Sequence, residues 1–70
     1  MFTNFKVSLA AARVNAGMTQ DALSKAIGVS KDTVYNWENG KAIPTAINLR
    51  KLSELSGIPM DYIFVPDKSD

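Results

Sequence analysis

Four glycines divide this chain of 70 residues into short stretches. Within these stretches apolar residues recur three or four positions apart, which is the period of an amphipathic helix. Glycine readily adopts the left-handed backbone conformation that often follows the last turn of a helix, because it has no Cβ. The sequence therefore predicts a series of short helices that end at Gly17, Gly28, Gly40 and Gly57.

Residues suited to N-terminal capping precede the periodic stretches. The predicted caps are Thr3 or Asn4 for the first helix, and then Thr19, Ser30 and Thr45. A short fifth helix is expected from Met60 to Phe64, with Pro66 blocking its continuation. Because no alternation typical of a strand is present, the sequence predicts an all-α fold of five short helices.

Apolar residues at helical spacing are more often core than cofactor contacts, so we assign them to packing. The predicted core consists of Leu9, Leu23, Ile27, Val34, Trp37, Leu52, Leu55 and Ile63. The stripe of the first helix is expected to include Phe5, Ala12 and Ala16 as well. In the fourth helix, Ile47 and Leu49 are expected to share the buried face.

The composition excludes several classes of protein. A chain this short forms one domain, expected at 1–66, followed by a disordered tail at 67–70. It contains no cysteine and no histidine, so disulfides, thiol nucleophiles and the usual metal ligands are missing. We therefore expect no metal, no cofactor and no enzymatic activity. Since no apolar run approaches ~20 residues and no signal peptide is apparent, we expect a cytoplasmic chain that binds no membrane.

The net charge of +1 is unevenly distributed along the chain. Residues 1–51 contain seven Lys and Arg against three Asp and Glu, whereas residues 52–70 contain one Lys against four Asp and Glu. Such an arrangement is typical of a protein that turns a basic face toward a polyanion, although an ordinary solvated surface explains it equally well. The spacing of polar side chains has to decide between the two.

The stretch 20–39 holds two predicted helices joined by the short turn Gly28-Val29-Ser30. A turn of this length makes two helices cross steeply instead of lying side by side. The small residues Ser24 and Ala26 fit the close contact that such a crossing needs. The second helix buries its apolar side, which leaves its opposite side polar and free. A protruding polar helix fits the major groove of DNA, which is ~12 Å wide.

Four groups of residues extend this pattern over most of the chain. They are Arg13-x-x-x-Gly17-Met18-Thr19-Gln20, Leu23-Ser24-x-x-Ile27-Gly28-Val29-Ser30, Val34-x-x-Trp37-Glu38-Asn39-Gly40-Lys41 and Leu52-x-x-Leu55-x-Gly57-Ile58-Pro59-x-Asp61-Tyr62-Ile63-Phe64. In this order and spacing they resemble the helix-turn-helix family of phage Cro and CI repressors, from about Leu9 to Phe64. The resemblance implies a lambda-repressor-like DNA-binding domain.

The resemblance also implies which residues read bases. The residues aligned with base-reading positions are Lys31, Asp32 and Asn36, with Thr33 and Tyr35 beside them. Lysine donates to guanine, asparagine pairs with adenine, and aspartate accepts from the cytosine amino group. For Asp32 the alternative is a helix-start or selectivity role. For Tyr35, contact with a thymine methyl and support of the DNA backbone are equally open.

Phosphate contacts are implied for a second set of residues, which are Gln20, Ser30, Asn39 and Lys41. Gln20 would be helped by the positive end of the helix dipole. Asn39 and Lys41 would use both side chains and backbone amides. The alternatives are an exposed helix-start residue at position 20 and a solvated loop lysine at position 41.

The resemblance further implies that Arg13 and Glu38 form an ion pair between the first helix and the end of the third. Both residues could otherwise be mistaken for charges that contact DNA. We interpret them as structural, because a partly buried pair is costly to break.

Recognition of an operator normally requires two copies of such a domain, ~34 Å apart along one face of a duplex. We therefore expect double-stranded DNA as the partner, and a homodimer formed either in solution or only on DNA. The candidate surfaces are Tyr62, Phe64 and Val65 at one end and Phe2 and Phe5 at the other, with completion of the core as an equal alternative. No small-molecule ligand is expected.

These interpretations predict a sequence-specific DNA-binding transcriptional regulator, a Cro-like repressor of phage or mobile-element type that occludes a promoter. The alternative is a module that binds another protein through the same fold, as an antitoxin binds a toxin. Only the first requires an affinity for duplex DNA that falls steeply with salt. An enzyme is disfavoured because the serines have no neighbouring base.

Overall fold

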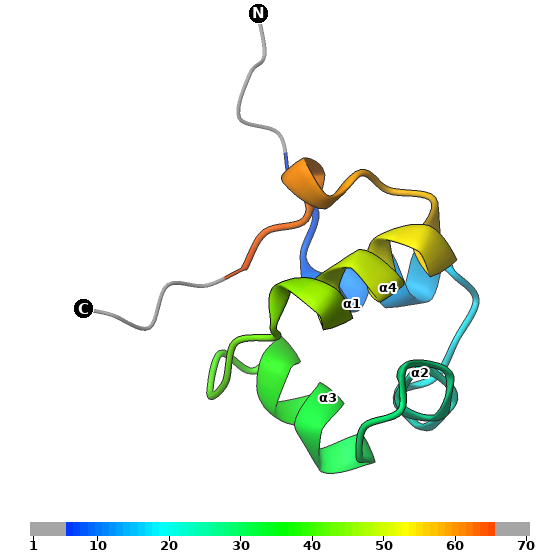
Figure 1. Ribbon diagram of the computed structural model, residues 1–70, viewed down its shortest axis with the longest axis vertical. Helices are drawn as coiled ribbons and strands as arrows, with labels where there is room; N and C mark the ends of the chain where they lie inside the picture. The colour runs from blue at the N-terminus through cyan, green and yellow to red at the C-terminus, as the bar shows by residue number, and fades with distance from the viewer. Residues whose placement is uncertain (1–5, 66–70) are drawn as a thin grey trace, which may run out of the picture.

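The computed structural model describes residues 6–65, which form four α-helices and one turn of 3-10 helix (Figure 1). The elements are α1 Leu9–Asn15, α2 Gln20–Ile27, α3 Lys31–Glu38, α4 Ala46–Ser56 and the 3-10 turn η1 Met60–Tyr62. Helix α2 packs on α3, α1 packs on α4, and α4 also contacts α2 and η1. The predicted all-α class is confirmed, but the described residues hold four α-helices, not five. None of these helices is long and apolar enough to cross a membrane.

Helix α1 begins later than the sequence predicts. Its N-cap is Ser8, whose Oγ accepts a first-turn amide at 3.0 Å. Val7, just before this cap, forms a parallel bridge with Ile63 and is bonded through both its amide and its carbonyl, at 2.8 and 2.7 Å. A residue paired in this way cannot belong to a helix, so the expected opening after Thr3 or Asn4 is wrong. Both of these residues lie outside the described range.

The other three helices begin and end where the sequence predicts. Their N-cap side chains each accept the backbone amide three residues further on, at 3.0 to 3.2 Å, and these caps are Thr19, Ser30 and Thr45. Helices α2 and α4 end at glycines in the left-handed conformation, Gly28 with φ +95° and Gly57 with φ +75°. Capping hydroxyls and terminal glycines therefore set these boundaries locally.

The predicted fifth helix is reduced to the single turn η1. Pro59 precedes this turn, and no side chain caps it. The amide of Ile63 still bonds to the carbonyl of Met60 at 3.1 Å, but Ile63 itself is extended and pairs with Val7. The expectation of a helix through Phe64 is therefore wrong, because the chain leaves helical geometry in order to pair with the N-terminal segment.

The core lies between the helices, and its buried apolar side chains are Leu9, Ala12, Leu23, Ile27, Val34, Trp37, Leu52 and Ile63. Leu55 is 39% exposed and Ile47 is 69% exposed, so the prediction that these two are buried is wrong. The covered face of α4 follows Leu49, Leu52 and Ser56. Residues spaced three and four apart share one helical stripe. Leu55 lies beside the buried stripe, and Ile47 lies on the opposite side of α4, which is why it is the more exposed of the two.

Polar side chains tie α4 to the ends of two other helices. Lys51 donates through Nζ to the carbonyl of Ile27 at 3.0 Å, at the end of α2. Asn15, at the end of α1, donates through Nδ2 to the carbonyl of Ser56 at 2.9 Å. Carbonyls in the last turn of a helix lack intrahelical partners, so both bonds satisfy groups that the helices leave unpaired. Helix α4 thereby holds the end of α2 in place, just before the turn into α3.

Replacing Gly28 with alanine is expected to destabilise the fold by about 1 kcal/mol, because alanine at φ +95° must adopt left-handed geometry. No atom beyond its chain neighbours lies within 4 Å of the position that a Cβ would take, so the cost is one of backbone conformation alone. Gly28→Asn should cost less, since asparagine tolerates this region. Thermal unfolding followed by circular dichroism measures both variants. Equal melting temperatures for the wild type and Gly28→Ala would contradict this account.

Candidate nucleic-acid interface

Helices α2 and α3 form the two-helix unit that the sequence predicts. The amides of Gly28 and Val29 both donate to the carbonyl of Ser24, at 2.8 and 3.0 Å, which closes α2 tightly before Ser30 caps α3. Ser24 is buried, as expected from its small size at the crossing. Ala26 is exposed, so the expectation that its size serves the crossing is wrong.

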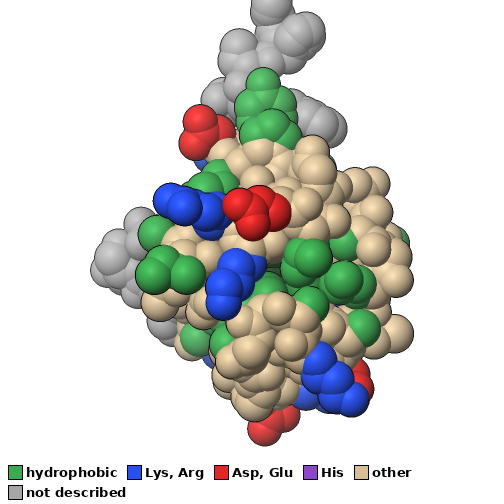
Figure 2. Space-filling view, turned by 45° about the vertical axis from the view of Figure 1, so that its right-hand side comes forward, with side chains coloured by type: hydrophobic (Ala, Val, Ile, Leu, Met, Phe, Trp, Pro, Cys, Tyr) green, Lys and Arg blue, Asp and Glu red, His purple; other side chains and the backbone are tan. Residues whose placement is uncertain are grey.

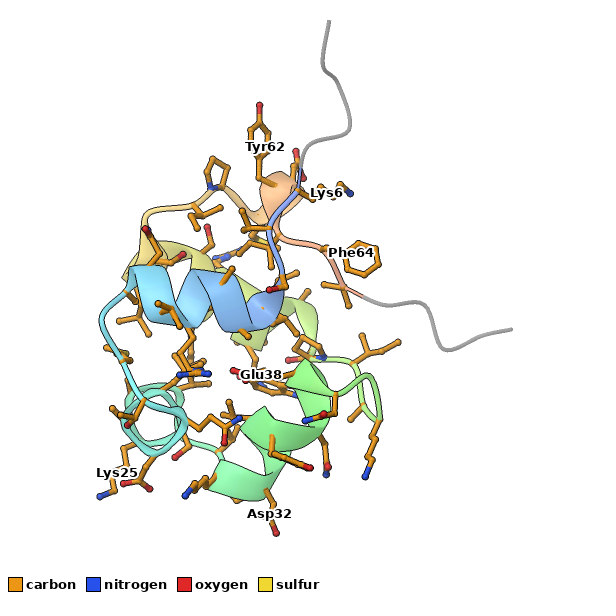
Figure 3. The ribbon with its side chains drawn as sticks, turned by 180° about the vertical axis from the view of Figure 1, so that it is seen from behind. Lys6, Lys25, Asp32, Glu38, Tyr62 and Phe64 are labelled. Atoms are coloured by element: carbon orange, nitrogen blue, oxygen red, sulfur yellow. The ribbon has the colours of Figure 1, made fainter. Side chains whose placement is uncertain are left out.

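The outer face of α3 is polar and open. Val34 and Trp37 are buried on the opposite face, which fixes the helix against the core. Of the five predicted base-reading residues, the exposed ones are Lys31, Asp32 and Tyr35, and the half-buried ones are Thr33 and Asn36. Figure 1 shows α2 and α3 together at the end of the molecule opposite η1, and Figure 3 shows Asp32 pointing outward there. The structure thus places all five residues on one helix at one end of the molecule.

The hydroxyl groups at the start of α3 bond to each other. Ser30 Oγ accepts the amide of Thr33 at 3.1 Å and lies 2.9 Å from Thr33 Oγ1. When Thr33 is the donor in this second contact, the hydroxyl hydrogen of Ser30 stays available to an acceptor outside the protein. The first-turn amides of Lys31 and Asp32 have no intrahelical acceptor, as at any helix start. This end of α3 therefore presents several donors to its surroundings.

The turn after α3 uses its backbone amides internally. The amides of residues 39–42 all donate to carbonyls in the second half of α3, at 2.9 to 3.3 Å. Asn39 also donates Nδ2 to the carbonyl of Tyr35 at 2.8 Å, and Lys41 Nζ lies 5.8 Å from the centre of the Tyr35 ring. The expected use of the backbone amides of Asn39 and Lys41 is therefore not supported. Their side chains keep N–H groups that these contacts do not use.

Arg13 and Glu38 form a two-point ion pair between α1 and the end of α3. Arg13 Nε donates to Glu38 Oε2 at 2.6 Å and Nη2 donates to Oε1 at 3.2 Å, while Nη1 donates to the carbonyl of Met18 at 3.0 Å. The side chains of Arg13 and Glu38 are only 17% and 8% exposed, and Figure 3 shows Glu38 in the middle of the molecule. Little solvent therefore screens the pair.

The hydrogen bond from Arg13 to Glu38 raises the pKa of Arg13 above its ordinary value, against the opposing effect of burial. A raised pKa in the folded state stabilises the fold at every pH below the unfolded value. This stabilisation is lost only as the pH rises through the folded pKa of Arg13. The contribution of Arg13 to the stability of the fold is therefore constant at all pH values near neutrality.

Gln20, the first residue of α2, joins this pair. Its Nε2 donates to Glu38 Oε1 at 3.0 Å, so the Glu38 carboxylate accepts three hydrogen bonds from two side chains. The sequence predicts a phosphate contact for Gln20 and does not indicate this bond. No local period could have indicated it, because the two residues are 18 positions apart and lie on different helices.

Charges of both signs lie around this unit. Lys25 of α2 pairs with Asp21 at 3.3 Å, and both are exposed, while Lys51 donates to the end of α2. On the face that Figure 2 displays, Lys and Arg side chains stand in separate groups with Asp and Glu nearby, and they form no broad basic patch. That face therefore offers a polyanion no broad positive field.

The order of the helices, the tight turn and the open face of α3 define the helix-turn-helix class of domain. The model of the Helix-turn-helix family matches residues 9–63, which is most of the chain. The chain therefore belongs to this family, which is one of DNA-binding regulators. Comparisons with curated proteins and with solved structures give no match.

Replacing Glu38 with alanine is expected to destabilise the fold by about 2 kcal/mol, because it leaves the largely buried Arg13 guanidinium without a counter-ion. In a domain of this size that loss corresponds to a fall of about 10 °C in melting temperature. The matched control is Glu54→Ala, which removes an exposed carboxylate from α4 and should change the melting temperature little. Thermal unfolding measures the melting temperature of both variants. Equal losses in melting temperature would show that the pair does not stabilise the fold.

Proposed function

We propose that this chain is a sequence-specific DNA-binding regulator of the Cro kind, a repressor of phage or mobile-element type that acts by occluding a promoter. The observation that carries the proposal is the open polar face of α3, which shares one end of the molecule with α2. Because the opposite face of α3 is packed through Val34 and Trp37, the helix can enter the major groove as a rigid unit.

Phosphate contacts on either side of the groove would fix the position of α3. Gln20 and Ser30 stand at the starts of α2 and α3, where unpaired amides and the helix dipole favour an anion. Asn39 and Lys41 follow the end of α3 and retain side-chain donors. Contacts of this kind set register and orientation without reading sequence.

Base readout is assigned to the outer face of α3. Lys31 and Asn36 have the donor and acceptor groups that pair with guanine and adenine. Asp32 has the acceptor for a cytosine amino group, and its place in the first turn of α3 also favours the helix itself. Thr33 and Tyr35 lie beside these residues and would supply additional contacts to bases or to the thymine methyl group.

A homodimer completes the proposed mode of binding, since two domains ~34 Å apart read an operator with two half-sites. Tyr62 and Phe64 are 55% and 51% exposed, and Figure 3 shows both rings pointing away from the body of the molecule. Exposure of this extent favours their use in an interface over completion of the core. Phe2 and Phe5, the second candidate surface, lie outside the described residues.

Selection of bound duplexes from a random pool is expected to yield a site with two-fold symmetry. Asn36→Ala and Lys31→Ala should bind that site more weakly and should each relax the preference at one base pair, by about 1–3 kcal/mol, because each removes a base-edge contact. Fluorescence anisotropy with the selected duplex and its single-base variants measures the preference. Uniformly weaker binding with an unchanged preference would overturn the assignment of these two residues.

Binding to a duplex of random sequence is expected to weaken steeply as salt rises, and Lys41→Ala should reduce the slope of log K against log salt by about 0.9, because one phosphate contact is lost. The matched control is Lys6→Ala, since Lys6 is exposed at the end of the molecule opposite α3 (Figure 3). Titration at several salt concentrations gives the slope for Lys41→Ala and for Lys6→Ala. A wild-type protein with no salt-dependent affinity for DNA would instead favour a protein as the partner.

A further inference from the structure

The Glu38 carboxylate determines which way the side-chain amide of Gln20 points. A carboxylate can only accept hydrogen bonds, so the atom of Gln20 that lies 3.0 Å from Glu38 Oε1 has to be the nitrogen Nε2 and not the oxygen. Glu38 therefore selects one of the two orientations that a glutamine amide can adopt. The ion pair with Arg13 fixes the carboxylate itself through two further bonds.

The selected orientation leaves one N–H of Gln20 available. The Nε2 amino group carries two hydrogens, and only one is used in the bond to Glu38. Gln20 is the first residue of α2 and is half-buried, at the helix end where backbone amides also lack intrahelical acceptors. A phosphate oxygen that approached this free N–H would meet a side-chain donor beside the unpaired backbone amides, provided that the amide nitrogen stays attached to Glu38.

We propose that Glu38, in addition to its structural pairing with Arg13, is a positioning residue for DNA binding, because it holds the amide of Gln20 with its donors toward a phosphate. The inference rests on the proposed function and deepens it. It links the ion pair that stabilises the fold to the affinity for DNA, although Glu38 itself is 8% exposed and carries the wrong charge to contact DNA.

Glu38→Gln separates the positioning role from the effect of charge, because the two change the affinity for DNA in opposite directions. In this variant the one remaining side-chain oxygen is claimed by Arg13, and the new amide nitrogen faces Gln20. Two amino groups repel, so the Gln20 amide turns over and its oxygen replaces the N–H that the proposal directs to the phosphate. Removal of a negative charge would by itself strengthen binding to a polyanion.

The experiment measures the affinity for a duplex of random sequence, at a temperature where circular dichroism shows every variant to be folded. Phosphate contacts are independent of sequence, so no operator is needed. Glu38→Gln is expected to bind about fivefold more weakly than the wild type, the effect of one lost hydrogen bond. Gln20→Met, which keeps the length of the side chain without donors, should show a similar loss. The double variant should be no weaker than Gln20→Met alone.

Glu54→Gln is the matched control, because it removes the same charge from an exposed site on α4 and should leave the affinity unchanged or raise it. Unchanged or tighter binding by Glu38→Gln, or losses that add in the double variant, would overturn the positioning role. Those results differ from failure of the proposed function itself, in which the wild type shows no salt-dependent binding to DNA.

A measurement on the wild type covers the case in which Glu38→Gln does not fold. Hydrogen exchange of the two Gln20 side-chain amide protons, followed by NMR, should be slow for one proton in the free protein and slow for both in the DNA complex. Rapid exchange of both protons in either state would overturn the proposal.

Discussion

Three helices meet at one carboxylate. Glu38 ends α3, accepts two hydrogen bonds from Arg13 of α1 and accepts a third from Gln20 of α2. With only 8% of its side chain exposed, this charge has little water to replace a missing partner, so each bond is worth more than it would be on the surface. The relative positions of α1, α2 and α3 are therefore not independent, and the shape of the two-helix unit depends on this single cluster.

At the open end of α3, side chains that the proposed function assigns to DNA also stabilise the helix. Ser30 caps the helix through Thr33, and Asp32 lies in the first turn, where the helix dipole favours a negative charge. Both residues would stabilise the helix even if the protein bound no DNA. A basic patch is not needed for such a surface, because placed donors can give specificity where a general field gives only attraction.

The parts of the fold that could be predicted from the sequence are the parts that neighbouring residues determine. The caps of α2, α3 and α4 and the glycine ends of α2 and α4 follow from groups within a few residues of each boundary. The start of α1 and the length of the last helix could not be predicted in this way. Both depend on pairing between Val7 and Ile63, which are far apart in sequence.

The same division applies to the site. The polar face of α3 follows from helical spacing alone, since burial of Val34 and Trp37 determines which side is left outside. The exposure of Leu55 depends on how much of α4 the other elements cover. The helical periodicity of the sequence does not give this information. The bond between Gln20 and Glu38 likewise forms only when α2 and α3 pack together, so the sequence of either helix alone does not indicate it.

The bridge between Val7 and Ile63 has a consequence for how the domain can be linked to other molecules. It joins the first and last described segments beside η1, at the end of the molecule that faces away from α2 and α3 (Figure 1). A tether, a fluorescent label or a fused protein attached through either segment would start away from α2 and α3, the two helices that the proposed function directs to DNA.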